Sequence, residues 1–463
     1  MNWVVYPANP LRGTVTVPGD KSISHRALIH AALAAGTSRI AGFLHAGVTE
    51  AMIRCARDLG VEVEIEPCEG SPGPLAATRA RAGETLECPP APRAAWGLGF
   101  ARLTLLVHGG QLHSPPSVLD CGNSGATIRM LMGALAGRPD VVATLTGSAG
   151  LRRRPMGRLI APLRQMGADI VEDAPPITLR GRSLHGIDYT LPVASAQVKA
   201  ALLLAALHAD GPTTIREPGP SRDHSERMLR ALGIPVVTHD QAVRLDPIGG
   251  PLPPFELRVP GDLSSAAFIL AAAAVIPHSE VTIPSVGVNP TRTGILDALT
   301  AMGADVEIAD RREASHEPLA DVTVRSSGLH GIAIDGDRVV RMIDEFPIVA
   351  VVATQAEGQT IVRDAAELRV KESDRIGTLA GELRQLGARI EERPDGFAIE
   401  GPTRLRGATV DSHGDHRLAM ALAVAGLMAD GKTTVLNAQA HRESFPTFGV
   451  LLRALGASIL DSD

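Results

Sequence analysis

Residues 18–26 read Pro-Gly-Asp-Lys-Ser-Ile-Ser-His-Arg and lead directly into an apolar, alanine-rich run. Pro and Gly bend the chain, and either Asp20 or Ser22 can cap the first backbone amides of a helix that follows. Lys21 and Arg26 then lie beside N–H groups that already favour an anion. The stretch therefore predicts a turn that presents a helix N-terminus to a negatively charged ligand.

The same pattern, a polar turn followed by an Ala/Leu-rich helix, returns five times along the chain. Each of these helices is followed by β-like segments and a second helix that ends in Leu-Gly or Met-Gly, about 40 residues after the first helix begins. A fixed period of this length indicates a repeat architecture, so we expect six similar units. The further turns are residues 121–129, 194–199, 261–265, 344–347 and 414–417, and the closing glycines are Gly60, Gly167, Gly233, Gly303, Gly387 and Gly456.

The strongest internal match joins residues 18–22 to residues 260–264, which divides the six units into two halves. We expect an α/β protein of two domains, residues 21–259 and residues 1–20 plus 260–463, with a hinge at the start of the second match. Because the alanine-rich helices carry little polar surface, they should be buried with the sheets outside them. This arrangement is an inside-out α/β barrel, the reverse of the usual doubly wound layout.

The composition limits the kind of protein. With 463 residues, of which 44% are hydrophobic, the chain can bury large cores. A net charge of −6 argues against nucleic acid as a partner. The N-terminus lacks a secretory signal pattern, and no apolar run reaches the roughly 20 residues that span a bilayer. We therefore expect a cytoplasmic protein that does not contact membranes.

Two further features bear on chemistry. The four cysteines lack the spacings of a zinc site or a disulfide framework. Residues 67–102, rich in Pro, Gly, Ala and Arg, interrupt the first unit and predict an irregular loop to which we assign no function.

Basic residues gather at the expected helix starts. Residues 151–155 read Leu-Arg-Arg-Arg-Pro. Arginine offers planar, bidentate donors to carboxylates and phosphates, so several converging arginines imply a ligand with several negative groups. The cations that we expect to form this anion clamp are Lys21, Arg129, Arg154, Arg375 and Arg417.

Two acids stand among these cations, Asp344 and Glu372. Each could simply be a salt-bridge partner, because ion pairs are common. Alternatively, two carboxylates beside a bound polyanion can move protons in opposite directions. The sequence contains no P-loop, dinucleotide-binding glycine fingerprint or His-Glu-x-x-His motif, so nucleotide, NAD and zinc-protease functions lose their main support.

With these residues in view, the chain closely resembles the 5-enolpyruvylshikimate-3-phosphate (EPSP) synthase family, over nearly its whole length apart from residues 67–102. The resemblance implies two inside-out α/β domains that close on phosphoenolpyruvate and shikimate 3-phosphate. It implies transfer of the enolpyruvyl group to the 5-hydroxyl of shikimate 3-phosphate with release of phosphate, on the pathway to chorismate and the aromatic amino acids. The motifs that carry it are Gly-Asp-Lys-Ser-Ile-Ser-His-Arg at 19–26, Gly-Asn-Ser-Gly at 122–125, Leu-Arg-Arg-Arg-Pro at 151–155, Ser-Ala-Gln-Val-Lys at 195–199, Arg-Val-Lys-Glu-Ser-Asp-Arg at 369–375 and Gly-Asp-His-Arg at 414–417.

The resemblance also implies roles for individual residues, and it calls for no metal or organic cofactor. Asp344 matches the proton acceptor for the attacking 5-hydroxyl, and Glu372 matches a group that protonates and later deprotonates the methylene carbon. Lys21 completes the catalytic set. We expect a monomer whose partners are its two small substrates. The implied phosphoenolpyruvate contacts are Lys21, Gly125, Arg154, Gln197, Arg375 and Arg417, and those to shikimate 3-phosphate are Lys21, Ser22, Arg26, Ser195, Gln197, Ser221, Asp344 and Lys371.

Two other functions stay open. The sister activity is enolpyruvyl transfer to a UDP-amino sugar, whose enzymes carry a reactive cysteine in a Pro-Gly-Gly-Cys type of loop that no cysteine here matches. A non-catalytic anion-binding repeat protein is the second, although it would have no reason to keep both acids in the clamp. Four positions depart from family patterns: Ala126, Met130, Ala196 and Gln439, the last of which stands where some members place a phosphate-contacting lysine.

Overall fold

The computed structural model describes residues 1–67 and 102–462. Within them the strands form six four-stranded sheets that share one pairing pattern. In each sheet an edge strand runs parallel to its neighbour, and the other two adjacent pairs are antiparallel. This repetition agrees with the six units expected from the sequence.

The strand orders follow the two groups of three units. The first three sheets are β14 (Glu256–Arg258), β3 (Gly36–Leu44), β5 (Arg102–Gly109) and β4 (Glu62–Pro67); β6 (Leu119–Asp120), β7 (Val142–Thr146), β9 (Ile177–Arg180) and β8 (Asp169–Ile170); and β10 (Asp188–Thr190), β11 (Thr213–Arg216), β13 (Ala242–Leu245) and β12 (Val236–His239). The other three are β16 (Asp305–Ala314), β17 (Glu317–Arg325), β15 (Glu280–Gly287) and β2 (Arg12–Thr14); β18 (Ala333–Ile334), β19 (Gly358–Val362), β21 (Gly396–Gly401) and β20 (Arg389–Arg393); and β22 (Thr409–Asp411), β23 (Thr433–Leu436), β1 (Asn2–Val5) and β24 (Ile459–Ser462).

Six helices are buried on nearly all sides, as their alanine-rich sequences predict. In α1 the cap is Asp20 and not Ser22, because the Asp20 carboxylate accepts the N–H of Ile23 at 2.9 Å. Side chains of Ser or Asp cap four more of these helices, whereas α11 begins without a side-chain cap and has Pro347 in its first turn. The six are α1 (Lys21–Leu33), α3 (Gly125–Ala136), α6 (Ala196–Ala206), α8 (Leu263–Val275), α11 (Phe346–Ala353) and α13 (His416–Met428).

A second set of six helices ends at the closing glycines. All six glycines have φ between 77° and 106°, a left-handed conformation that L side chains rarely adopt, which is why the sequence places glycine there each time. These helices are α2 (Gly47–Asp58), α5 (Gly157–Gln165), α7 (His224–Ala231), α9 (Gly294–Ala301), α12 (Gly377–Gln385) and α14 (Phe448–Ala454). Shorter helical turns are α4 (Ala149–Arg152), α10 (Asp337–Arg341), η2 (Ala366–Val370) and η3 (Ala438–Glu443).

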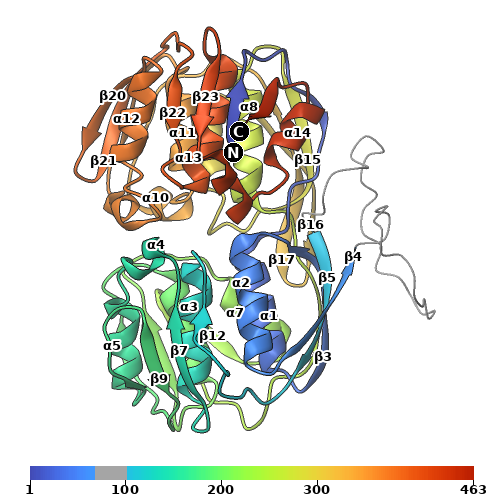
Figure 1. Cartoon of the computed structure of the whole chain (residues 1–463), viewed down its shortest axis with the longest axis vertical. Coiled ribbons are helices and arrows are strands. Elements are labelled where there is room, and N and C mark those ends of the chain that lie inside the picture. Colours follow the sequence, from blue (N-terminus) through green and yellow to red (C-terminus); the bar gives the residue numbers. More distant parts are fainter. Residues whose placement is uncertain (68–101, 463) are drawn as a thin grey trace, which may run out of the picture.

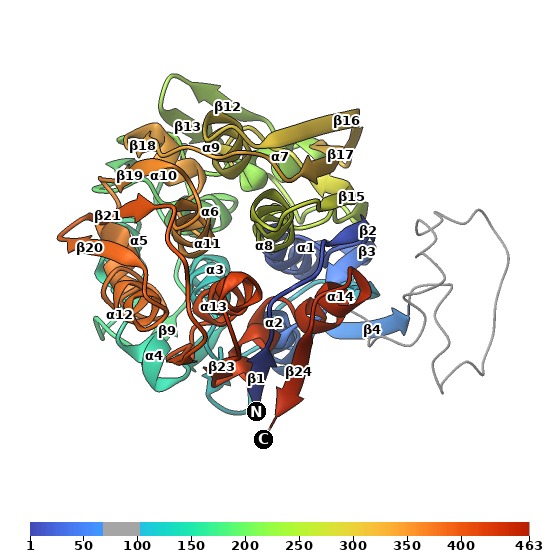
Figure 2. The same ribbon diagram turned by 90° about the horizontal axis from the view of Figure 1, so that it is seen from above.

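The buried apolar side chains form two clusters, one from residues 23–259 and one from residues 3–17 and 263–459. We call residues 21–259 the first half and residues 1–20 with 260–463 the second half; their standing as two mobile domains stays a prediction. The halves lie one above the other in Figure 1, and in Figure 2 the buried helices occupy the centre with the sheets around them.

The predicted loop at 67–102 falls mostly on residues 68–101, which lie outside the described residues. Its flanking strands β4 and β5 are antiparallel neighbours, with Pro67 opposite Leu103. Among the described residues, no helix is both long enough and apolar enough to cross a membrane. Cys55 and Cys121 are buried thiols that form no disulfide.

Candidate active site

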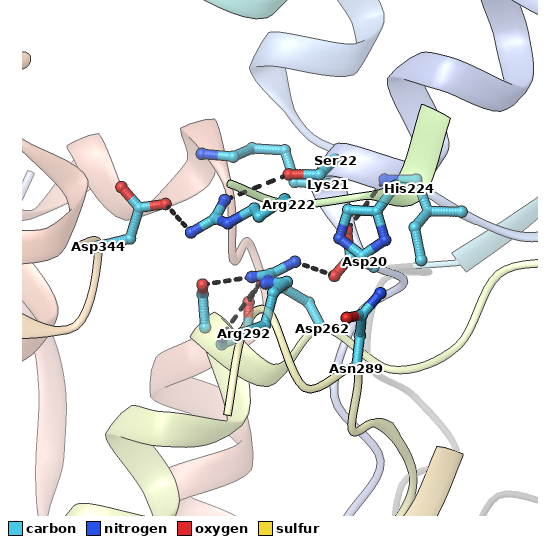
Figure 3. A network of polar contacts seen from close by, with 12 residues as sticks. Asp20, Lys21, Ser22, Arg222, His224, Asp262, Asn289, Arg292 and Asp344 are labelled. Carbon is cyan, nitrogen blue, oxygen red and sulfur yellow. Dashed lines mark hydrogen bonds and ion pairs between the residues drawn. The ribbon is translucent and has the colours of Figure 1, made fainter. Parts of the chain in front are cut away.

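The two segments that cross between the halves pair with each other. The backbone N–H of Asp20 donates to the carbonyl of Pro260, and the N–H of Asp262 donates to the carbonyl of Pro18, both at 2.8 Å. The guanidinium of Arg292, from the second half, reaches both capping carboxylates, Asp20 and Asp262 (Figure 3). The starts of α1 and α8 are thereby fixed side by side at the junction of the halves.

A pocket opens at this junction. Its walls come from the starts of α1, α3 and α6 in the first half and from residues 339–344 and 364–372 in the second. All but three of the site residues expected from the sequence line this pocket, although they are spread over 350 positions of the chain. They are Lys21, Ser22, Arg26, Arg154, Ser195, Gln197, Ser221, Asp344, Lys371 and Glu372.

The other three expected residues are Gly125, Arg375 and Arg417, which do not themselves line the pocket. A Cβ atom added to Gly125 would lie 2.8 Å from a terminal nitrogen of Arg129 and 2.9 Å from one of Arg154, so this glycine leaves room for the cation cluster. Arg375 and Arg417 are 1% and 2% exposed. Both act on the pocket through their charge.

Asp344 is surrounded by cations from both halves. Its carboxylate lies 2.7 Å from Arg222, 3.6 Å from Arg375 and 4.0 Å from the ammonium of Lys371. Burial alone would raise the pKa of this carboxyl, but Arg222, Lys371 and Arg417 outweigh it and hold the pKa well below its usual range. The Asp344 side chain is therefore a carboxylate in this arrangement of charges.

Glu372 is held in the same way. One oxygen lies 2.8 Å from Arg375, and the other lies 3.1 Å from Arg154 of the first half. Burial works to raise its pKa, whereas Arg375 and Arg154 lower it well below the usual range. Both carboxylates thus lie against arginines whose guanidinium groups are suited to bind an anionic ligand.

Lys21, the first residue of α1, lies where the two carboxylates and Arg417 meet. Burial, and secondly Arg417, lower its pKa to about 8, while Asp344 and Glu372 act in the opposite direction. An anion bound at this ammonium would favour its charged form. A bound anion would therefore raise the pKa of Lys21 and form an ion pair with its ammonium.

The first-half wall of the pocket is built on buried hydrogen bonds. Arg26 is 2% exposed and donates to Ser225 Oγ at 2.7 Å and to the carbonyl of Ala196 at 3.0 Å. Ser195 caps α6. The hydroxyl of Ser221 is buried and has no hydrogen-bond partner in the described part of the chain. A buried hydroxyl left unsatisfied at a pocket wall is suited to a polar ligand.

In residues 1–67 and 102–462, no group of three or more His, Cys, Asp or Glu side chains is placed to hold an ion.

Residues 5–76 and 101–451 match the family model described as EPSP synthase (3-phosphoshikimate 1-carboxyvinyltransferase). The chain belongs to the EPSP synthase family. Residues 77–100, between the matched segments, lie within the predicted loop.

Individual relatives agree over nearly the full length. A 3-phosphoshikimate 1-carboxyvinyltransferase of Gloeobacter violaceus is 49% identical over 96% of both chains, and one of Desulforudis audaxviator is 47% identical over 98% of this chain and 99% of its own. A solved structure of the EPSP synthase of Acinetobacter baumannii has a TM-score of 0.82 at 39% identity and covers both chains completely. The alternatives of a UDP-sugar enzyme and a non-catalytic repeat protein gain no support from these matches.

Several residues that line the EPSP synthase pocket were not expected from the sequence, among them Arg222, Arg158 and Glu367. Arg222, which pairs with Asp344, was not expected, because its contact depends on how the halves meet; its only signal is its position beside Ser221 before α7. Arg129 was expected in the clamp, and it hydrogen-bonds Gln197 at the pocket wall.

The positions that depart from family patterns fall into two groups. Ala126 and Ala196 line the pocket, whereas Met130 is fully buried in the first-half core. Gln439 lies in η3 and is not part of the pocket wall among the described residues.

Proposed function

We propose that this pocket catalyses the reaction of the EPSP synthase family. The enolpyruvyl group of phosphoenolpyruvate passes to the 5-hydroxyl of shikimate 3-phosphate, and phosphate is released. The chain is then a transferase of the shikimate pathway, which leads to chorismate and the aromatic amino acids. The observation that supports this best is a pair of carboxylates, Asp344 and Glu372, whose side chains are each 15% exposed and lie among cations drawn from both halves.

Phosphoenolpyruvate carries a phosphate and a carboxylate, so it needs several converging cations. We assign its binding to Lys21, Arg154, Arg375 and Arg417, with Gln197 as a polar contact and Gly125 as the residue whose missing side chain leaves room. Planar guanidinium groups match both anions of the substrate.

We assign shikimate 3-phosphate to the first-half wall and to Asp344 and Lys371 of the second half. Its phosphate and hydroxyls need both donors and acceptors, which the pocket lining supplies. The unsatisfied hydroxyl of Ser221 supports a polar ligand there. The residues assigned to it are Lys21, Ser22, Arg26, Ser195, Gln197, Ser221, Asp344 and Lys371.

The reaction needs one base and a second group that first donates a proton and later removes one. Asp344 takes the proton of the 5-hydroxyl as that oxygen bonds to C2 of phosphoenolpyruvate, while Glu372 gives a proton to C3. In the second step Glu372 removes a proton from C3, the C2–C3 double bond returns, and phosphate leaves with the electrons of its C–O bond. Lys21 and the arginines stabilise the negative charge that is moved.

Substrate binding also prepares Glu372 for this work. A general acid must carry a proton, yet Arg375 and Arg154 keep Glu372 ionised in the protein alone. When the anions of phosphoenolpyruvate compete for the same arginines, the carboxyl loses part of that stabilisation and its proton affinity rises. Binding of phosphoenolpyruvate thus supports protonation of its own methylene carbon.

The test uses Asp344→Asn and Glu372→Gln, which keep shape but remove proton transfer. We expect kcat, measured by released phosphate, to fall by about two to four powers of ten, with much smaller changes in KM. Glu382→Gln is the matched control, because Glu382 is also 15% exposed and ion-paired, to His413, but lies outside the pocket. Near-normal kcat in either site variant would remove the role assigned to that residue.

The expected cytoplasmic location, monomeric state and absence of nucleic-acid partners stay predictions from the sequence.

A further inference from the structure

Residues 221–225, at the start of α7, contact the pocket on one side and a hairpin of the second half on the other. Arg222 points into the pocket, where one terminal nitrogen lies 2.7 Å from the carboxylate of Asp344 and the other donates to Ser22 Oγ at 3.4 Å. Ser225 Oγ accepts a hydrogen bond from Arg26 at 2.7 Å. This side of the segment therefore belongs to the proposed shikimate 3-phosphate site.

The two residues between them face the opposite way, toward the second half. His224 Nδ1 lies 2.7 Å from one carboxylate oxygen of Glu317, and the other oxygen accepts from the side-chain amide of Asn289 at 3.1 Å. The same amide donates to Asp223, the N-cap residue of α7, at 2.7 Å. In Figure 3 Arg222 is directed toward Asp344, while His224 and Asn289 lie together on the other side.

A hairpin of the second half brings Glu317 to this place. Strands β16 and β17 are joined by Ser315 and His316, both with positive φ, and Figure 1 shows the pair extending alongside the first half. Ser315 Oγ accepts the backbone N–H of Arg258 at 3.1 Å, and the carbonyl of His316 accepts from Arg227 at 3.2 Å. Ser315, His316 and Glu317 of the hairpin thus each hydrogen-bond a residue of the first half.

These contacts are buried, so they are sensitive to loss of a partner. The side chain of His224 is 1% exposed and that of Glu317 is 7% exposed. Both oxygens of Glu317 are engaged, and the amide of Asn289 is oriented by its own oxygen, which accepts the N–H of Thr291 at 2.9 Å. A buried hydrogen-bonded group whose partner is removed must reorganise or stay unsatisfied.

We infer that Glu317 and Asn289 are positioning residues for shikimate 3-phosphate. From the second half they fix Asp223 and His224, and through them they set Ser221, Arg222 and the contact of Ser225 with Arg26. This inference rests on the proposed function and adds residues that touch no substrate.

The effect should fall on one substrate. Arg154, Arg375 and Arg417, assigned to phosphoenolpyruvate, are held elsewhere, by Glu372, by Asp415 and by the carbonyl of Ser264. Loosening residues 221–225 therefore leaves those cations in place. A general loss of packing, by contrast, would weaken both substrates together.

The experiment measures kcat and both KM values for Glu317→Gln and Asn289→Ala. We expect the KM for shikimate 3-phosphate to rise about tenfold, with the KM for phosphoenolpyruvate and kcat within about twofold of wild type. Glu313→Gln is the matched control, since Glu313 lies on the same hairpin with a side chain 65% exposed. It should leave all three values unchanged.

A double-mutant cycle of Glu317→Gln with His224→Gln adds a second readout. If the pair acts as one unit, the double variant should raise the KM for shikimate 3-phosphate no more than the stronger single variant does. Equal rises in both KM values, or unchanged KM values in soluble, folded variants, would overturn the inference. A wild-type protein that released no phosphate from the two substrates would instead refute the proposed function.

Discussion

Residues 18–26 and residues 260–268 begin two equivalent helices, yet they do different work. Both start Pro-Gly-Asp, both use the aspartate as an N-cap, and both helices are 13 residues long and buried. Where the first has Lys21 and Arg26 in the pocket, the second has Leu263 and Phe268 in the core. The repeat supplies the position and orientation of a helix start, and individual side chains then decide whether that start binds an anion.

The apolar copy still contributes to the site. The guanidinium of Arg417 lies over the ring of Phe268, 5.9 Å from its centre, and donates to the carbonyl of Ser264 at 3.3 Å. A cation placed over an aromatic face gains a favourable interaction when it is desolvated. The second stretch therefore supports Arg417, a cation that acts on the pocket through its charge, without presenting a charge of its own.

Replacing the first residue of each helix should give the largest difference in activity between the two stretches. Lys21→Met removes a charge at the point where both substrates are assigned, so kcat/KM should fall by about a hundred- to a thousandfold. Leu263→Met, the equivalent change in α8, preserves volume and should leave kcat/KM within about twofold. Steady-state assays of released phosphate compare the two variants. Similar losses in both would mean that the helix starts matter only as packing elements.

The two glycines of the matched turns should differ in stability. A Cβ at Gly19 would lie 2.0 Å from the carbonyl oxygen of Gly42, whereas one at Gly261 would have its nearest neighbours at 3.1 Å. Gly19→Ala should therefore cost about 3 kcal/mol of unfolding free energy and Gly261→Ala only about 1 kcal/mol. Urea unfolding followed by circular dichroism measures both values. A larger loss of unfolding free energy in Gly261→Ala than in Gly19→Ala would contradict this account of the two turns.

What the sequence could predict follows from this contrast. The turns, the closing glycines and the buried helices are local patterns repeated six times, and the structure confirms them. Arg222 and the Glu317–His224 contact could not be predicted, because they depend on how two halves meet. The linear pattern also could not tell that Arg222 holds Asp344 ionised, or that Glu372 is held ionised by Arg375 and Arg154, which were expected to bind substrate, since that needs their distances.

The smallest effect concerns the charge that distinguishes α1 from α8. Because burial lowers the pKa of Lys21 to about 8, its ammonium is mostly charged at pH 7 and mostly neutral at pH 9. Affinity for shikimate 3-phosphate should be highest well below pH 8, where Lys21 is charged. It should fall as the pH rises through the Lys21 pKa of about 8, and should be about tenfold weaker at pH 9 than at pH 7. The phosphate group, with a second pKa near 6, keeps its charge over this range.

Two buried histidines and the two acids of the pocket do not titrate between pH 7 and 9. His25 and His416 stay neutral from pH 7 to 9, because burial lowers their pKa values to about 4 and about 3. Asp344 and Glu372 stay ionised from pH 7 to 9, since neighbouring cations hold their pKa values well below the usual range. Titration calorimetry of shikimate 3-phosphate at pH 7, 8 and 9 measures the loss. In Lys21→Arg the guanidinium keeps its charge at pH 9, so whatever affinity remains should no longer depend on pH. An equally steep loss in this variant would assign the titration to another group.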